Sequence, residues 1–437
     1  MQSITPALLL LAVLTALGVP PLAQARQIGV IEPALPLNAQ RVATTVPTAL
    51  QASWTDYLAR SQRQLQVDKA ALAAERAAGG VVPPAPASGN GEKSMPLNQP
   101  PAWYGSAEAL RVADNIVSFQ TPAGGWGKNQ PRDGAVRQKG QAYVASNRSR
   151  FLAPGDLDTP ADDEWNYVGT IDNDATITEI RFLAKVANAA TSEPLASSYR
   201  TSAIRGLEYL LAAQFPNGGW PQVWPLQGGY HDAFTLNDNA IIEVAELLDK
   251  AGQGRDGFGF LPPQLKERAQ AASQRAIYGL LAAQLVVGGR KSLWAQQYDA
   301  LTLTPTSARN YEPVALCTSE SAAVLNYLMT LPAPSPAIVD AIEGGVAALR
   351  TLALEGKAWR VVNEADGKQL VSAPGAPTLW ARYYGITTLQ PVFGDRDKSL
   401  HDDVAGVSLE RRRGYAWFGT LPQKTLDTYA RWKQGRP

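Results

Sequence analysis

The sequence Gln120-Thr-Pro-Ala-Gly124-Gly125-Trp126 recurs as Gln214-Phe-Pro-Asn-Gly218-Gly219-Trp220, and Gln284-Leu-Val-Val-Gly288-Gly289 is a decayed third copy. Each copy follows a stretch that is predicted to be a helix ending in glutamine, and the glycine pair begins four positions after that glutamine. A helix end that repeats at a fixed spacing indicates one supersecondary unit used several times, and such units bury their apolar faces by stacking on neighbours. The repeat therefore predicts helical hairpins arranged around an axis.

Apolar residues recur at helical spacing through the main body of the chain. Helices are expected over 177–187, 204–211, 241–248, 264–284, 319–330, 336–352 and 421–433. Strand signals are few, and Trp359-Arg-Val-Val362 is one of them. Long polar loops such as 215–237 and 285–318 separate the helices, and loops of this length in a compact domain are usually functional.

The N-terminal part of the chain has a different composition. Residues 1–25 carry no charged side chain, and their apolar run followed by Ala23-Gln24-Ala25 predicts a secretory signal cleaved after Ala25. Residues 54–76 are expected to form one amphipathic helix, and a stretch rich in glycine and proline follows to about Pro101. We therefore expect a signal peptide (1–25), a helical segment with a linker (26–101) and a main domain (102–437) in a secreted or periplasmic protein.

The charge balance limits the function classes that the chain can belong to. The 437 residues include 40 basic and 39 acidic side chains, which gives a formal net charge of +1. A nucleic-acid-binding protein needs a basic surplus, so we expect no nucleic-acid partner. No segment after the leader is apolar enough to span a membrane. Cys317 is the single cysteine, which excludes an intrachain disulfide, and we expect a monomer.

Two triplets of Asp and Asn stand just before predicted helices, Asp172-Asn173-Asp174 and Asn237-Asp238-Asn239. Either triplet alone is more often a helix N-cap, because Asp and Asn accept hydrogen bonds from the free amides of the first turn. Two such triplets at two helix starts favour a cation site, since Ca²⁺ binds several carboxylate and amide oxygens. Both interpretations stay open, because a capping residue can also face a cleft.

Three cationic side chains are expected in loops of the repeat body. Lys128 follows the first Gly-Gly-Trp, Arg309 lies in a loop bounded by prolines, and Arg396 lies in Phe393-Gly-Asp-Arg-Asp397. Each of them alone is usually a solvated charge or an ion-pair partner. Together they suit a polyanionic ligand that carries carboxylates.

Tryptophans follow the repeats and could stack on sugar rings. For Trp126 and Trp220 we expect instead that they plug the ends of helical hairpins, whereas Trp224 is a candidate for sugar binding. Repeats of the form Gln-x-x-x-Gly-x-Trp also look like those of triterpene cyclases. Ala175 stands where the acid motif of those enzymes needs Asp, the chain is short for two helical barrels, and a secreted protein would not meet isoprenoid substrates.

Eight motifs occur along the chain in one order: Gly-Gly-Trp-Gly-Lys128-Asn, Ile-Asp172-Asn-Asp-Ala-Thr, Gly-Gly-Trp-Pro-Gln-Val-Trp-Pro, Leu-Asn-Asp238-Asn-Ala, Trp294-Ala-Gln-Gln-Tyr-Asp299, Ala-Arg309-Asn-Tyr-Glu-Pro, Trp380-Ala-Arg-Tyr-Tyr384 and Gly-Tyr415-Ala-Trp417-Phe-Gly. In this order they resemble the pectate lyases of polysaccharide lyase family 10. The likeness extends from about Trp54 to Trp432.

The resemblance implies a mainly α fold, an (α/α) toroid with long irregular loops and few short strands. It also implies Ca²⁺-dependent β-elimination on pectate, the α-1,4-linked polygalacturonate, which gives 4,5-unsaturated oligogalacturonates. The reaction removes the proton on C5, next to the uronate carboxylate. A cation bound to that carboxylate withdraws charge and stabilises the enolate-like state.

The resemblance also assigns roles by motif position. It implies that Arg309 is the catalytic base, that Asp172 and Asp238 bind Ca²⁺, and that Arg396, Lys128, Asp174 and Trp224 are candidates for binding substrate. Free arginine has a pKa above about 12, so its neutral form is rare. We expect burial and nearby cations to lower the pKa of Arg309, and we expect an alkaline pH optimum.

Two other function classes stay open. In a toroid glycoside hydrolase acting on a uronate polysaccharide, Asp172 and Asp238 would be the acid and the base across the cleft, without a need for Ca²⁺. A glycan-binding protein without catalytic activity would bind oligogalacturonate but form no unsaturated product.

Overall fold

The structure is a computed structural model, and it describes residues 25–78, 80–89, 95–149 and 151–435. The predicted signal peptide, apart from its last residue, lies outside the described residues. The α-helices are α1 (Ala39–Thr45), α2 (Thr48–Ala77), α4 (Ala107–Ser118), α5 (Ile177–Ala189), α6 (Glu193–Ala213), α7 (Ala240–Gly252), α8 (Pro263–Ala283), α9 (Thr318–Thr330), α10 (Pro336–Thr351), α11 (Leu409–Gly414) and α12 (Leu421–Gln434). Short 3₁₀ helices are η1 (Pro101–Gly105), η2 (Asp172–Asp174), η3 (Gly229–Asp232), η4 (Asn237–Asn239), η5 (Phe258–Phe260) and η6 (Val404–Gly406).

The strands are short and belong to small separate sheets. They are β1 (Gln27–Val30), β2 (Phe234–Thr235), β3 (Val286–Val287), β4 (Arg290–Lys291), β5 (Gln297–Tyr298), β6 (Pro305–Thr306), β7 (Leu316–Cys317), β8 (Lys357–Asn363), β9 (Gly367–Ser372), β10 (Trp380–Ala381), β11 (Tyr383–Tyr384), β12 (Phe393–Gly394), β13 (Ser399–His401) and β14 (Phe418–Gly419). Their pairing orders are β1-β13-β12, β2-β5-β6, β3-β4, β7-β11, β8-β9 and β10-β14.

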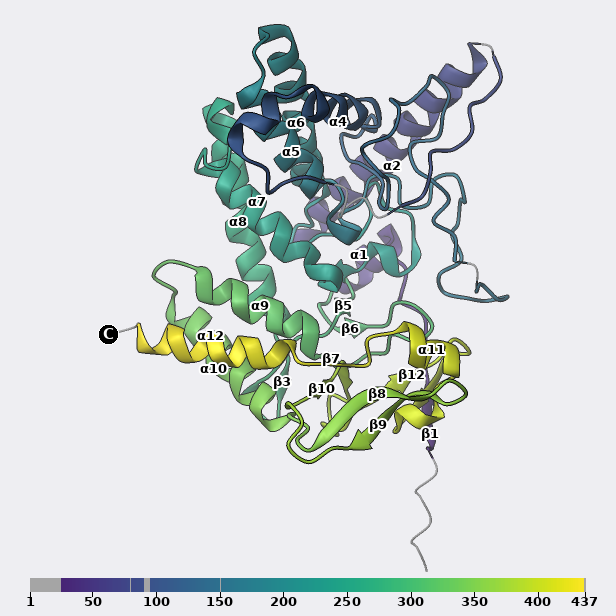
Figure 1. Ribbon diagram of the computed structural model, residues 1–437, viewed down its shortest axis with the longest axis vertical. Coiled ribbons are helices and arrows are strands. Elements are labelled where there is room, and N and C mark those ends of the chain that lie inside the picture. The colour runs from purple at the N-terminus through teal and green to yellow at the C-terminus, as the bar shows by residue number, and fades with distance from the viewer. Residues whose placement is uncertain (1–24, 79, 90–94, 150, 436–437) are drawn as a thin grey trace, which may run out of the picture.

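The helices form two layers of an (α/α) toroid (Figure 1). The hairpins α5–α6, α7–α8 and α9–α10 each join an inner helix to an outer one, α5 and α9 both pack on α7, and α6 and α10 both pack on α8. Helix α4 packs on the first hairpin, and α12 packs on α9 and α10. The predicted fold class is therefore confirmed, with short strands that lie in the loops.

The long connections that link one repeat unit to the next lie at one end of the toroid. They are residues 119–176, 214–239, 284–317 and 352–420, and each runs from the C-terminus of an outer helix to the N-terminus of the next inner helix or, for the last, to α12. The connections within a hairpin lie at the opposite end and are short. Because the helices of a hairpin are antiparallel, one end of the toroid collects both the inner-helix N-termini and nearly all the irregular chain.

The repeated motif closes the outer helices at that end. Each repeat Trp is buried and donates its indole N–H over 2.7 Å to a carbonyl in the last turns of the preceding helix: Trp126 to Ile116, Trp220 to Leu210, Trp294 to Leu280 and Trp380 to Leu349. Helix C-termini leave carbonyl groups without intrahelical partners, so an N–H donor there stabilises the helix end. The plugging role expected for Trp126 and Trp220 is the one observed.

The glutamines and glycines of the motif join one unit to the next. Gln120 and Gln214 each donate to the turn that follows and to a carbonyl of the next outer helix, at 2.7–2.9 Å. Gly218 has a φ of 95°, and a side chain there would meet the Arg275 carbonyl oxygen at 2.1 Å, which explains the glycine. In the third copy a β3–β4 hairpin separates Gln284 from its tryptophan, Trp294.

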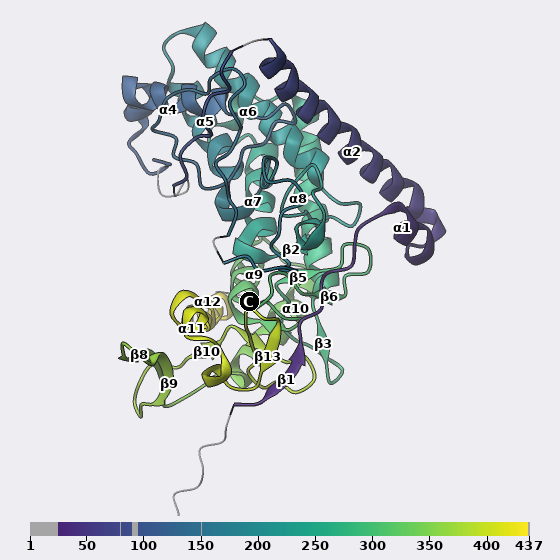
Figure 2. The same cartoon turned by 90° about the vertical axis from the view of Figure 1, so that its right-hand side faces the viewer.

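Helix α2 is one long helix along an edge of the molecule, and β1 lies beside β13 (Figure 2). Helix α2 begins six residues earlier than the helix expected over residues 54–76. The Tyr57 hydroxyl donates to the Ala213 carbonyl over 3.1 Å, and the Leu226 amide donates to the Ser61 hydroxyl over 2.8 Å. The helix therefore packs on the second repeat and on its long loop. Among the described residues no helix is long and apolar enough to cross a membrane.

Candidate active site

The two Asp/Asn triplets meet at the loop end of the toroid. They form η2 before α5 and η4 before α7, these two turns pack against each other, and η4 also packs against the start of α9. The backbone is left-handed at Asn173, Asp174, Thr176, Asp238 and Asn239, with φ between 51° and 68°. Such backbone costs about 1–3 kcal/mol per non-glycine residue and gathers at functional sites. The triplets therefore form a strained turn pair, and they do not act as ordinary N-caps: neither helix start has a side-chain cap hydrogen bond.

Asp172 lies at the floor of this turn pair and is 3% exposed. Its Oδ2 accepts from the Lys128 ammonium over 2.5 Å, and its Oδ1 accepts from the Gln222 amide over 2.8 Å. Burial opposes ionisation, but the Lys128 cation and its hydrogen bond lower the pKa of Asp172 below its ordinary value. Asp172 is therefore a fixed anion.

Asp238 is within hydrogen-bonding reach of Asp172, and its side chain is exposed to solvent. Desolvation and the Asp172 carboxylate raise the pKa of Asp238. Because the side chain is exposed, we attribute more of the increase to the neighbouring carboxylate than to desolvation. Asp238 is therefore the member of the pair that takes up a proton as the pH falls, while Asp172 stays ionised.

The acidic pair suits a hard cation in the chemistry of its donors. Two adjoining carboxylates present ligands of the kind that Ca²⁺ binds, because Ca²⁺ takes about six to eight oxygen ligands. Among the described residues no cluster of three or more His, Cys, Asp or Glu side chains is arranged to hold a metal ion. The protein would therefore supply only part of a cation's ligands, and substrate carboxylates and water would supply the others.

Lys128 stands between the acidic pair and an aromatic wall. Its ammonium lies 3.4 Å from the centre of the Tyr167 ring. Burial opposes the charge, but Asp172 and Tyr167 raise the pKa of Lys128 above its ordinary value, so the side chain is a permanent cation. The structure therefore joins Lys128 to Asp172, as the resemblance implied for two residues of one site.

Arg309 is partly exposed and is held from one side. Its Nε donates to Glu312 Oε2 over 3.0 Å, and its side chain is 33% exposed. Within the described part of the chain its two Nη nitrogens have no hydrogen-bond partner in the protein. Arg309 is close enough to Lys128, Asp172 and Asp238 to shift the pKa of each. The Nη groups are thus available to a ligand bound near the acidic pair.

The expected direction of the Arg309 pKa is wrong. Burial lowers it, but Glu312 and the surrounding tyrosines Tyr311, Tyr230 and Tyr415 raise it by more, so the pKa lies well above its ordinary value. The nearby cation Lys128 does not outweigh a carboxylate in direct contact. Neutral Arg309 is therefore rarer in this structure than in water.

Arg396 belongs to the same surface, one ring away from Arg309. Its guanidinium lies 5.4 Å from the centre of the Tyr311 ring and 4.4 Å from the centre of the Phe151 ring. The Arg309 guanidinium lies 5.5 Å from the centre of the same Tyr311 ring. Arg396 also forms a bidentate ion pair with Glu410, at 2.8 and 3.2 Å. The structure thus brings the three predicted cations into one neighbourhood.

Two candidate residues differ from the others. Asp174 is partly buried at the end of η2, and its backbone carbonyl accepts from the Thr178 hydroxyl over 3.0 Å. Trp224 is 3% exposed and packs edge-on against Tyr209, with ring centres 5.6 Å apart. Its indole ring has no free face for a sugar, so the expectation that Trp224 stacks on substrate is corrected to a core role.

Sequence reasoning found Lys128 but missed three other polar residues that occupy the same position of the repeat. Two positions after each repeat Trp stand Lys128, Gln222, Gln296 and Arg382. Lys128 and Gln222 contact Asp172, and Arg382 contacts Glu320 on α9 over 2.6 Å and Gln296 over 3.5 Å. The repeat could have identified these residues, because a side chain two positions after the repeat Trp faces the common axis in every unit.

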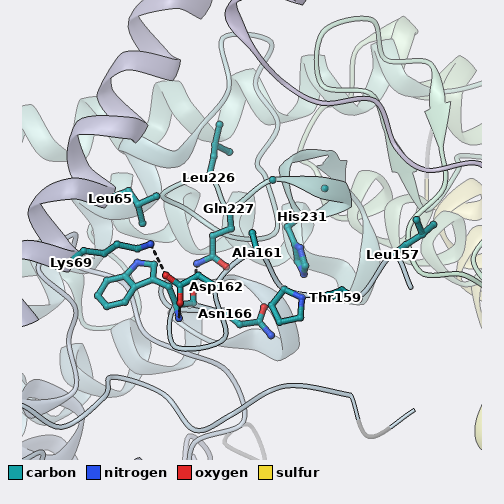
Figure 3. Close-up of a pocket in the computed structure, with 14 residues that line it drawn as sticks. Leu65, Lys69, Leu157, Thr159, Ala161, Asp162, Asn166, Leu226, Gln227 and His231 are labelled. Atoms are coloured by element: carbon teal, nitrogen blue, oxygen red, sulfur yellow. Dashed lines mark hydrogen bonds and ion pairs between the residues drawn. The ribbon is translucent and has the colours of Figure 1, made fainter. Parts of the chain in front are cut away.

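A cavity of about 330 Å³ lies behind the site, between α2 and the long loops (Figure 3). On one side of it Lys69 of α2 forms an ion pair with Asp162 over 2.7 Å, and on the other side stands His231. His231 packs edge-on against Tyr167, the ring that contacts Lys128, with centres 4.8 Å apart. Helix α2 therefore braces the loops that form the wall of the site.

Comparisons with known proteins agree with this geometry. The model of the pectic acid lyase family matches residues 120–426. A solved family 10 polysaccharide lyase from Cellvibrio cellulosa is 30% identical, with a TM-score of 0.63 over 78% of this chain and 97% of that one. A mutant of a family 10 lyase from the same organism, in complex with trigalacturonic acid, is also 30% identical, with a TM-score of 0.63 over 79% of this chain and 99% of that one. No curated protein matches the chain.

Proposed function

The chain belongs to the pectic acid lyase family and to family 10 of the polysaccharide lyases, and from this premise we propose that it cleaves polygalacturonate by Ca²⁺-dependent β-elimination with Arg309 as the base. It is a lyase enzyme of polysaccharide degradation. The observation that carries the proposal is that the two Arg309 Nη nitrogens have no hydrogen-bond partner among the described residues, while Arg309 is close enough to Asp172 and Asp238 to lower the pKa of both.

The charges around the site support a uronate polymer as substrate. Lys128, Arg309 and Arg396 lie along one stretch of the loop layer, and each is a permanent cation at neutral pH. A polygalacturonate chain carries one carboxylate per sugar, so successive residues would meet successive cations. The trigalacturonic acid bound by the related enzyme is a ligand of this class.

The acidic pair supports a cation at the reacting sugar. Asp172 and Asp238 would hold Ca²⁺, which supplies charge withdrawal from the substrate carboxylate when bound. Lys128 keeps Asp172 ionised, and it would approach a carboxylate of the substrate from the same side. In its neutral form Arg309 would take the C5 proton on an Nη nitrogen while Glu312 holds its Nε. The electron pair of the C5–H bond would then form the 4,5 double bond as the C4–O bond breaks, and the leaving oxygen would take a proton from water or from the guanidinium just formed.

The same pair argues against a hydrolase. A retaining glycosidase needs its two carboxyl groups about 5–5.5 Å apart and an inverting one about 6.5–9.5 Å apart. Asp172 and Asp238 are within hydrogen-bonding reach of each other, which leaves room neither for a sugar nor for a water between them.

We also propose secretion with a leader removed after Ala25, since the polymer lies outside the cell.

Ultraviolet absorbance during incubation with polygalacturonate tests the proposal. The 4,5 double bond absorbs, whereas hydrolysis creates no such chromophore. We expect absorbance to rise with Ca²⁺, to stop when a chelator is added and to resume with excess Ca²⁺. A rise that is indifferent to chelation would overturn the Ca²⁺ assignment, and reducing-sugar release without absorbance would favour the hydrolase.

A further inference from the structure

A chain of hydrogen bonds runs from Arg309 through the two long connections 284–317 and 352–420. Glu312 Oε2 accepts from Arg309 Nε, and Glu312 Oε1 accepts from the Tyr415 hydroxyl over 2.9 Å. The Tyr415 and Tyr383 hydroxyl oxygens are 2.7 Å apart, and the Tyr383 hydroxyl is in contact with the side-chain amide of Gln296. Glu312, Tyr383 and Gln296 are buried, and Tyr415 is partly buried.

The number of hydroxyl protons decides the direction of this chain. Three contacts need three donors, but Tyr415 and Tyr383 supply one proton each. If Tyr383 donates to Gln296, the contact between the two tyrosines has no proton. If the amide is turned so that Gln296 Nε2 donates to Tyr383, each of the three contacts has a donor, this nitrogen gains the partner that it otherwise lacks, and only the long 3.5 Å contact of Arg382 with Gln296 Oε1 is given up. Each hydroxyl then donates toward Glu312.

We infer that Glu312 and Tyr415 are positioning residues for the catalytic base, and that the donor chain Gln296–Tyr383–Tyr415 sets the orientation of Arg309 through Glu312. The inference rests on the proposed function of Arg309. An ionised carboxylate that receives one hydroxyl donor on Oε1 and the guanidinium on Oε2 has one orientation, so the Arg309 plane is fixed by its Nε while both Nη nitrogens stay without a partner among the described residues.

The chain links the base to the repeat position that faces the axis. Gln296 stands two residues after Trp294, at the position that Lys128 occupies in the first unit. Tyr383 lies on β11, which pairs with β7 just before α9. The base is on a loop, but its orientation therefore depends on residues whose backbone belongs to the regular repeat.

Three variants test the inference: Glu312→Gln, Tyr415→Phe and, as a matched control, Tyr384→Phe. Tyr384 is the neighbour of Tyr383 and is also buried, but its hydroxyl accepts from the Ala381 amide and donates to the Leu352 carbonyl, away from Arg309. We expect Tyr415→Phe to lower kcat about tenfold or more, the value of a hydrogen bond to a charged group, with KM changed less than threefold. Tyr384→Phe should lower the melting temperature but leave kcat unchanged.

Glu312→Gln gives a readout that a merely structural role would not move. The variant keeps an acceptor for Nε but removes the negative charge that raises the Arg309 pKa. The rise of the rate with pH should therefore begin at lower pH. At the same time kcat should fall about 10–100-fold, because Arg309 loses its orientation. The other groups that face Arg309 are unchanged: Tyr311, Tyr230, Tyr415, Asp158, Lys128, Asp172, Asp238 and Arg411.

The outcomes separate this inference from the proposed function. If Arg309→Ala is inactive while Glu312→Gln and Tyr415→Phe keep the kcat and pH profile of wild type, the positioning role is wrong and the base assignment stands. If Arg309→Ala is fully active, the base assignment itself is wrong. A loss of kcat in Tyr415→Phe that Tyr384→Phe reproduces would show a general effect of stability and would also overturn the inference.

Discussion

The helical shell and the loop layer of this protein are held together in different ways. In the shell, apolar faces pack and one indole N–H per unit closes an outer helix, as at Trp126 and Trp220. In the loop layer the contacts are mostly between charges, such as Lys128 with Asp172 and Arg309 with Glu312. The same contact can therefore recur in every unit of the shell, whereas each charged pair of the loop layer needs its own geometry.

The difference has a cost in backbone conformation. Five residues of η2, η4 and their flank have left-handed backbone, although none of them is glycine. The packing of the shell offsets this strain energy, because η2 and η4 lead directly into the packed helices α5 and α7. The comparison teaches that stability and chemistry are separable in this fold: changes to the shell should alter unfolding, and changes to the loop layer should alter rate.

The largest expected effect is on rate and comes from the loop layer. Arg309→Ala should lower kcat by about 10³-fold or more, within the usual range for loss of a general base and of a charge at the reacting centre. Its stability should also fall, because the buried Glu312 carboxylate loses its cation, so the rates are compared in folded protein. Arg290→Ala on β4, also exposed, is the matched control and should match wild type. Lyase rates with thermal melting would check both, and an active Arg309→Ala would break the comparison.

The pH dependence of the wild-type rate sharpens the same point. The base must lose its proton to act, so the rate should rise with pH, and Glu312 raises the Arg309 pKa rather than lowering it. We therefore expect no plateau before the protein begins to unfold at alkaline pH. Initial rates of unsaturated-product formation across the pH range, with folding followed by circular dichroism, would check this. An optimum at acidic pH would contradict the arginine base.

The shell should respond in stability alone. Trp220→Phe removes the N–H that Leu210 accepts at a fully buried position and leaves a small cavity, so it should lower the free energy of unfolding by about 2 kcal/mol. Its kcat at 25 °C should equal that of wild type. Denaturant unfolding together with kcat measures both quantities. A large loss of kcat in folded protein would show that the shell and the site are more closely coupled than their contacts indicate.

The smallest effect concerns a buried carboxylate in the wall of the loop layer. Asp232 Oδ1 accepts from the Gln227 and Gly228 amides at 3.1 and 3.0 Å, and burial raises the pKa of Asp232 to about 7. A raised pKa means that the contribution of Asp232 to stability is present below its unfolded value near pH 4 and is lost as the pH rises through 7.

Asp232→Asn keeps the acceptor and removes the charge. It should therefore stabilise the protein by about 1 kcal/mol above pH 7 and have no such effect near pH 4. Melting temperatures at the two pH values would check the sign. Equal shifts at both would indicate a packing effect in place of titration.

Particular residues show how far sequence reasoning reaches. The helices, the plugging tryptophans and the family were predictable, because a 3.6-residue period and a repeated motif depend on local physics. Asp172, Asp238, Lys128 and Arg309 were found from motif order, and the structure places them together. Trp224 was misassigned, because an indole on a loop looks the same in sequence whether it faces a sugar or packs on Tyr209.

What the sequence by itself determined is the repeating unit: a helix that ends in glutamine, a glycine turn and a tryptophan plug, with polar loops between the units. Only the tertiary structure decided how charges on distant loops meet. The sign of the Arg309 pKa shift depends on whether Glu312 or Lys128 lies closer, and Coulomb energies fall with distance. No local pattern encodes a distance between residues 128 and 309, so the electrostatics of the site exists only once the repeat units have stacked.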